Sequence, residues 1–138
     1  MIVLDTDILT FYLHDHPGVV QRVQDAGDDV VLTIISRIET LHGRFASLLK
    51  AANGEELQRG QLRLEQAERD LARFPVLPVT AAAAAEFDRL RQHKKLKKLG
   101  RGDLLIAAIT LANRATLVTR NLKDFRQVPG LQIENWAD

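Results

Sequence analysis

Cysteine is absent from this chain of 138 residues, and aromatic residues make up only 5% of it. Without thiols the chain forms neither disulfides nor thiolate metal sites, so a bound metal would need oxygen or imidazole ligands. No apolar run approaches the ~18 residues that span a bilayer, and no signal-peptide pattern opens the chain. We therefore expect a cytoplasmic protein with no membrane contact.

The composition predicts one folded domain in which acidic and basic residues are nearly balanced. With 46% hydrophobic residues the chain is long enough for one core and too short for two ordinary domains, so we expect a single domain over residues 1–138. The 19 basic and 18 acidic residues leave a net charge of +1. Such a balance does not by itself indicate a polyanionic partner.

One basic stretch departs from this balance. Basic residues recur from Arg89 to Arg101, and no acidic residue interrupts them before Asp103. A run of this kind is often a solvated helix end or loop. Its place directly before a candidate metal ligand favours contact with phosphate groups instead.

Hydrophobic periodicity predicts alternating strands and helices. Apolar and β-branched runs indicate strands at residues 1–5, 30–35, 75–79, 116–119 and 131–133, the last at an edge. Helical spacing and capping residues predict helices at residues 8–13, 17–26, 36–52, 55–74, 81–92 and 104–112. This order predicts an α/β fold with a mostly parallel central sheet of four to five strands and helices on both faces.

Four carboxylates stand where such a fold would bring them together. Asp5 ends the first strand, and Glu39 follows the second within a helical turn; Asp103 opens a helix, and Asp124 follows the fourth strand. Two unit charges about 4 Å apart repel by roughly 4 kcal/mol at an effective dielectric of 20, so the group needs a divalent cation or protonation. Oxygen ligands suit Mg²⁺ or Mn²⁺. We expect Asp5 and Asp103 to bind it first, with Glu39 and Asp124 completing the site.

Four polar residues near these acids are candidates for supporting roles. Asp7 is suited either to cap the helix that follows or to bond the neighbouring backbone and fix the loop, and Ser36 is an N-cap or a donor to the site. Thr119 stands where it would orient a carboxylate or water. Asn121 would contact phosphate or cap the turn that contains Asp124. A metal-activated water in such a site attacks phosphorus, which indicates phosphodiester hydrolysis.

Four motifs in this order resemble those of PIN-domain ribonucleases, most closely the VapC-type toxins of VapBC toxin–antitoxin pairs. They cover essentially the whole length and comprise residues Met1 to Asp7, Ser36 to Gly43, Gly102 to Ala108 and Thr119 to Phe125, with the ending Leu131 to Trp136.

The resemblance implies a PIN-like fold and a Mg²⁺- or Mn²⁺-dependent endoribonuclease toxin. It further implies a homodimer and inhibition by a small antitoxin, part of which lies over the active site. The four acids match the family's metal site, whereas Asp7 stands where the family often has asparagine. The helix predicted at residues 55–74 then becomes part of the antitoxin-binding or dimer surface. Residues expected to contact RNA are Lys94, Lys95, Lys97, Lys98, Arg101 and Arg120.

Two other function classes compete with this interpretation. In a haloacid-dehalogenase-like phosphatase, Asp5 would be the nucleophile and Asp7 the acid/base. Such enzymes place another acid about four residues after a Gly-Asp pair, and the residue here is Ala107. A non-catalytic RNA-binding module would explain the basic run and leave the four acids unexplained, because acids repel phosphate without a metal.

Overall fold

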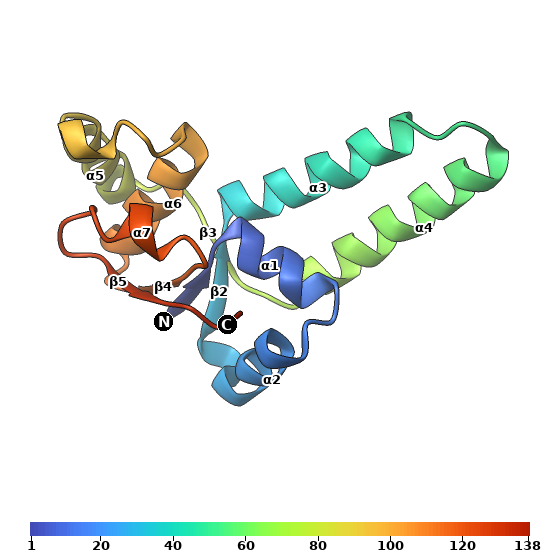
Figure 1. Cartoon of the computed structure of the whole chain (residues 1–138), viewed down its shortest axis with the longest axis horizontal. Coiled ribbons are helices and arrows are strands. Elements are labelled where there is room, and N and C mark those ends of the chain that lie inside the picture. Colours follow the sequence, from blue (N-terminus) through green and yellow to red (C-terminus); the bar gives the residue numbers. More distant parts are fainter.

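Five parallel strands form the centre of the molecule in the computed structural model, which describes residues 1–138 (Figure 1). The strands are β1 (Ile2–Leu4), β2 (Val30–Thr33), β3 (Val76–Leu77), β4 (Thr116–Val118) and β5 (Gln132–Glu134). Their order across the sheet is β3-β2-β1-β4-β5, and every neighbouring pair is parallel. The predicted parallel sheet is confirmed, with β5 at an edge.

Seven helices connect these strands in the predicted alternation. They are α1 (Thr6–Leu13), α2 (Pro17–Ala26), α3 (Ile34–Leu49), α4 (Gly54–Leu71), α5 (Ala81–Arg91), α6 (Arg101–Ala112) and α7 (Leu122–Phe125). Two short 3₁₀ turns, η1 (Gly27–Asp29) and η2 (Lys94–Leu96), precede β2 and α6.

The boundary between β2 and α3 differs from the prediction. Residues Ile34 and Ile35 are helical, although their β-branched side chains favour a strand. Thr33 ends the strand because its hydroxyl accepts a hydrogen bond from the Ser36 backbone N–H at 3.1 Å and so caps the helix. This local cap outweighs the strand preference of the two isoleucines.

Side chains alternate along the central strands and give the sheet two apolar faces. Val3, Val31 and Leu117 pack in one buried cluster with Leu90 of α5 and Ile106 of α6. The alternate strand residues pack on the other face with side chains of α1, α2 and α4, in a cluster that includes Leu4, Ile8, Val19, Leu32, Leu71 and Val118. Helices therefore cover both faces, and burial of each such leucine or valine contributes about 1.5–3 kcal/mol.

Helices α3 and α4 form a long hairpin that extends away from the sheet (Figure 1). Only the sheet-proximal end of α4 is buried, at Ala67 and Leu71. Further out, Leu49, Leu57 and Leu62 are 50–69% exposed. Gly60 lets the two helices approach closely, since a Cβ there would lie 3.0 Å from Leu48 Cδ1. None of the helices in the structure has the length and apolar content to cross a membrane.

Two glycines in this hairpin provide a matched test of its packing. Gly43→Ala should raise the free energy of unfolding by about 0.5–1 kcal/mol, because the site is open and alanine favours the helix. Gly60→Ala should be less stable than Gly43→Ala by about 1 kcal/mol or more, since its Cβ would also lie 3.3 Å from Leu48 Cα. Urea unfolding measures both. Equal stabilisation by the two substitutions would contradict the close contact of α3 with α4.

Candidate active site

Asp5 lies at the carboxyl end of the central strand β1, where its side chain is almost completely buried at 4% exposure. The Asp5 backbone N–H donates to the Val118 carbonyl of β4 at 3.0 Å, which extends the ladder between the strands by one residue. Its carboxylate caps α1 by accepting the Ile8 backbone N–H at 2.9 Å. The sheet and the helix together therefore fix this acid in place.

Burial raises the pKa of Asp5 from 3.8 to about 6. Hydrogen bonds from the Thr119 hydroxyl and the Ile8 backbone N–H oppose the rise, and the charges of Asp7 and Asp103 add to it. Thr119 is itself fully buried. Its predicted role in orienting a carboxylate agrees with this contact.

Asp103 lies in the first turn of α6 and is partly buried. Burial raises the pKa of its carboxyl, and the carboxylates of Glu39, Asp7 and Asp124 raise that pKa further. Asp103 therefore lies within electrostatic reach of each of the other three predicted acids, Asp5, Glu39 and Asp124. Asp5, Asp7, Glu39, Asp103 and Asp124 form no ion pair with lysine or arginine.

Glu39 projects from the second turn of α3 and is held by a residue that the sequence interpretation missed. The Thr6 hydroxyl donates to Glu39 Oε1 at 2.7 Å and also lies 3.0 Å from the Ser36 hydroxyl. Gly102 faces the other carboxylate oxygen, since a Cβ there would lie 3.2 Å from Glu39 Oε2. The position of Thr6 between Asp5 and Asp7 in the first motif was the available signal.

Asn121 and Asp124 form a second local arrangement after β4. The Asn121 side chain caps α7, accepting the Asp124 backbone N–H at 3.4 Å, and its amide donates to Asp124 Oδ2 at 3.0 Å. The Thr119 hydroxyl accepts the Asn121 backbone N–H at 3.0 Å. Asn121 was predicted either to contact phosphate or to cap the turn that contains Asp124, and the structure shows the capping role.

Two predicted supporting roles need correction. Asp7 caps no helix and accepts no hydrogen bond from the loop, because Asp5 is the N-cap and Asp7 is an exposed residue of the first turn of α1. Its contribution is negative charge, which raises the pKa of Asp5 and Asp103. Ser36 is not an N-cap either, since Thr33 takes that position. It is fully buried and contacts Thr6, in keeping with the alternative role of a donor near the site.

Most of the predicted basic residues gather beside Asp124. A hollow of about 440 Å³ is lined by Lys94, Lys95, Lys97, Lys98 and Lys123 together with Asp124. We call this the lysine hollow.

Arg101 and Arg120 lie outside the lysine hollow. The Arg101 guanidinium stacks over Phe87 at 5.6 Å. Arg120 stacks over Phe11 at 5.3 Å and forms an ion pair with Asp138 at 3.6 Å. Both guanidinium groups therefore already have partners within the chain.

The acids offer only oxygen donors, which is the ligand type that Mg²⁺ and Mn²⁺ prefer. In the structure, no three carboxylate or imidazole groups lie close enough together to bind one metal ion. Asp103 accepts no hydrogen bond from the protein and is only partly buried, so its side chain is free to turn toward the other acids. The uncompensated charge and the donor chemistry therefore fit a divalent cation.

Comparison with known proteins decides the family. The model of the PIN domain family matches residues 2–131. The chain belongs to the PIN domain family.

Individual relatives match this PIN domain along its whole length. It is 29% identical over 142 residues to ribonuclease VapC2 of Rickettsia felis, with 96% of each chain covered. Among solved structures, it is similar to DNA-bound VapBC from Salmonella typhimurium, with a TM-score of 0.81, 25% identity and coverage of 98% and 97%. VapBC2 from Rickettsia felis bound to a promoter DNA fragment gives a TM-score of 0.78, 27% identity and 99% coverage of both chains.

The buried Asp5 makes the stability of the metal-free PIN domain depend on pH. Its pKa rises from 3.8 to about 6 on folding, so its favourable contribution is complete below pH 3.8 and is lost as the pH rises through about 6. Asp5→Asn carries no charge and keeps an acceptor for the Ile8 N–H. At about pH 8 the free energy of unfolding of the variant should therefore be up to about 3 kcal/mol higher than that of the wild type.

Urea unfolding with a chelator at about pH 4 and about pH 8 measures this difference. The exposed Asp88→Asn of α5 is the matched control and should change stability by less than about 0.5 kcal/mol at either pH. An Asp5→Asn variant less stable than the wild type at about pH 8 would contradict the inferred cost of the buried charge.

Proposed function

We propose that this PIN domain is a Mg²⁺- or Mn²⁺-dependent endoribonuclease that hydrolyses RNA phosphodiester bonds as a VapC-type toxin under the control of an antitoxin. One observation carries the proposal. Carboxylates from the end of β1 and from α3, α6 and α7 share one edge of a parallel sheet without a basic partner. Ligands of α/β folds bind at this carboxyl edge.

Asp5 and Asp103 are the residues that would hold the cation first, and Glu39 and Asp124 would complete its coordination directly or through water. A divalent cation bound there supplies positive charge for the phosphate and activates water for attack on phosphorus. The hydrogen bonds to Asp5, Glu39 and Asp124 keep those carboxylates pointed along the site before substrate arrives.

Glu39 is the best placed of the four acids to accept the proton of the attacking water. It is exposed to solvent, whereas Asp103 and Asp124 are partly buried and Asp5 is buried. The Thr6 hydroxyl occupies Oε1 and leaves Oε2 free. Because Gly102 has no side chain, the approach to Oε2 stays open.

The lysine hollow supports a polyanionic substrate. Its five lysines make no ion pair within the chain, and the hollow includes Asp124 itself. Phosphates on either side of the cleaved bond would therefore meet positive charge next to the acids. We assign this contact to Lys94, Lys95, Lys97 and Lys98. Arg101 and Arg120 lie outside the lysine hollow and would contact RNA farther from it. The choice of RNA follows the ribonuclease name of the Rickettsia felis relative.

An antitoxin partner is supported by the surface of the α3–α4 hairpin. Ile38, Phe45, Leu49, Leu57 and Leu62 are exposed apolar residues on these two helices. Exposed apolar patches of this kind mark protein interaction sites. The similar solved structures are VapBC complexes. We assign the hairpin to antitoxin binding and, by the same family resemblance, a homodimeric state to the toxin.

The surroundings of Asp7 favour this function over the phosphatase alternative. That alternative needs an acid/base positioned beside the Asp5 nucleophile. The exposed Asp7 has no hydrogen bond that would position it as an acid/base. Membership of the PIN domain family points the same way.

The direct test uses antitoxin-free protein and a fluorescent RNA. We expect cleavage with Mg²⁺ or Mn²⁺ and none with chelator. Asp5→Asn and Asp103→Asn should each lower kcat/KM by about 100-fold or more, because several kcal/mol of charge stabilisation is lost. Asp88→Asn on the exposed face of α5 is the control and should retain wild-type activity.

Circular dichroism would verify that the inactive variants are folded. Cleavage that persists with chelator, or in both site variants, would contradict the proposed metal site. Hydrolysis of p-nitrophenyl phosphate without cleavage of RNA would identify a phosphatase instead.

A further inference from the structure

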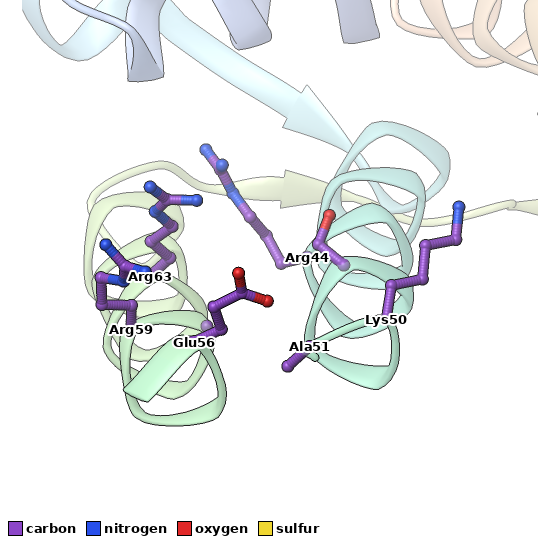
Figure 2. A pocket seen from close by; sticks show the side chains of 8 residues that line it. Arg44, Lys50, Ala51, Glu56, Arg59 and Arg63 are labelled. Atoms are coloured by element: carbon purple, nitrogen blue, oxygen red, sulfur yellow. The ribbon is translucent and has the colours of Figure 1, made fainter. Parts of the chain in front are cut away.

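A second basic hollow lies between α3 and α4, away from the four acids. It has a volume of about 310 Å³, and the charged residues that line it are Arg44, Lys50, Glu56, Arg59 and Arg63. Figure 2 shows Arg44 and Glu56 in the space between the helices, with Arg59 and Arg63 on the α4 side and Lys50 pointing away. Three arginines thus converge from two helices. We call this the arginine hollow.

The positive charge of the arginine hollow is not balanced within the chain. None of its basic residues forms an ion pair, and the Glu56 carboxylate already accepts the Ala52 backbone N–H at 2.7 Å. Near the end of α4 Arg69 donates a hydrogen bond to the Gln66 side chain, and Arg73, just beyond the helix, pairs with Asp70. Arg44, Arg59 and Arg63 therefore remain available to an anionic ligand.

Helical spacing gives the two flanks of α4 different chemistry. Glu56, Arg59 and Arg63 recur at intervals of three and four residues and lie on one flank. On the other flank an apolar hollow of about 600 Å³ is lined by Leu48, Leu57 and Leu62 with two glutamines. The α3–α4 hairpin therefore carries two separate recognition surfaces.

We infer that the arginine hollow binds a backbone phosphate of the RNA substrate at a distance from the bond that is cleaved. This inference rests on the proposed ribonuclease function. The planar guanidinium forks of arginine match the oxygens of a phosphate and form paired, charge-assisted hydrogen bonds with it. A phosphate entering the hollow would offset the unpaired charge of Arg44, Arg59 and Arg63.

The lining favours RNA over a segment of a protein partner. Ala51 is the single hydrophobic residue of the arginine hollow, so a peptide would find little apolar surface there. The apolar hollow on the other flank suits a peptide better. The acids and the arginines also share one rigid element, because α3 carries both Glu39 and Arg44.

The length of α3 indicates how far the substrate must extend. At about 1.5 Å per residue, Arg44 lies about 7.5 Å and Lys50 about 16 Å beyond Glu39 along the helix axis. Stacked nucleotides advance by about 3.4 Å each. An RNA that occupies both the acidic site and the arginine hollow therefore needs about two to five nucleotides on one side of the cleaved bond. A dinucleotide is too short, because its single phosphate is the one that is cleaved.

The first test measures RNA affinity in the inactive Asp103→Asn background, so that cleavage does not interfere. Adding Arg59→Gln and Arg63→Gln should weaken binding of a long single strand by about tenfold or more. The slope of log affinity against log salt should fall in magnitude by about 0.7, the value for one lost phosphate contact on a single strand. The matched control is Arg69→Gln in the last turn of α4 with Arg73→Gln just beyond the helix, which should leave the slope unchanged.

The second test compares substrates of two lengths in the otherwise wild-type enzyme. Arg59→Gln with Arg63→Gln should lower kcat/KM for long RNA by about tenfold and leave cleavage of a dinucleotide unchanged, since only the long substrate has a second phosphate to place in the arginine hollow. Loss of activity on both lengths would overturn the inference, because it would place the arginines in the chemistry itself.

The outcomes separate the two proposals. If the wild type cleaves RNA while the arginine variant keeps its affinity and salt slope, the phosphate site is wrong and the nuclease function stands. If the arginine variant binds RNA normally but loses an acidic partner protein, the hollow serves that partner and the inference fails. A wild type that does not cleave RNA would overturn both proposals.

Discussion

Mutual repulsion among ionised carboxylates is the constraint on which the functional edge of this PIN domain depends. Asp103 lies within electrostatic reach of four other acids, and no lysine or arginine pairs with any of the five. The two apolar clusters on either side of the sheet hold the strands and helices that carry these acids. The core thus stabilises an arrangement that the acids alone would disfavour, and a divalent cation would relieve the repulsion.

The four principal acids differ in how the surrounding residues hold them. Asp5, Glu39 and Asp124 each accept a hydrogen bond from a neighbour, whereas Asp103 is influenced mainly by burial and by other acids. Three acids are therefore oriented in advance and the fourth remains adjustable. Positive charge lies in two places around them, in the lysine hollow beside Asp124 and in the arginine hollow further along α3.

Much of this arrangement was predictable because it depends on local patterns. Apolar β-branched runs predicted the strands, and parallel topology places the ends of such strands at one edge. The contact of Thr6 with Glu39 joins residues 33 positions apart and depends on how α1 packs against α3. The first motif could therefore place Thr6 near the site but could not identify Glu39 as its partner. The arginine hollow likewise depends on the register of α3 against α4. At Ile34 and Ile35, strand propensity gave the wrong element because the Thr33 cap outweighs it.

Direct measurement of Mn²⁺ binding tests most simply whether the four acids form a metal site. Isothermal titration of metal-free protein at neutral pH should show binding in the wild type and in Asp88→Asn. Binding should weaken by about tenfold or more in Asp5→Asn and in Asp103→Asn, since each substitution removes a charged oxygen ligand. Wild-type affinity in both site variants, or no binding by the wild type, would contradict the assignment of these carboxylates to a divalent cation.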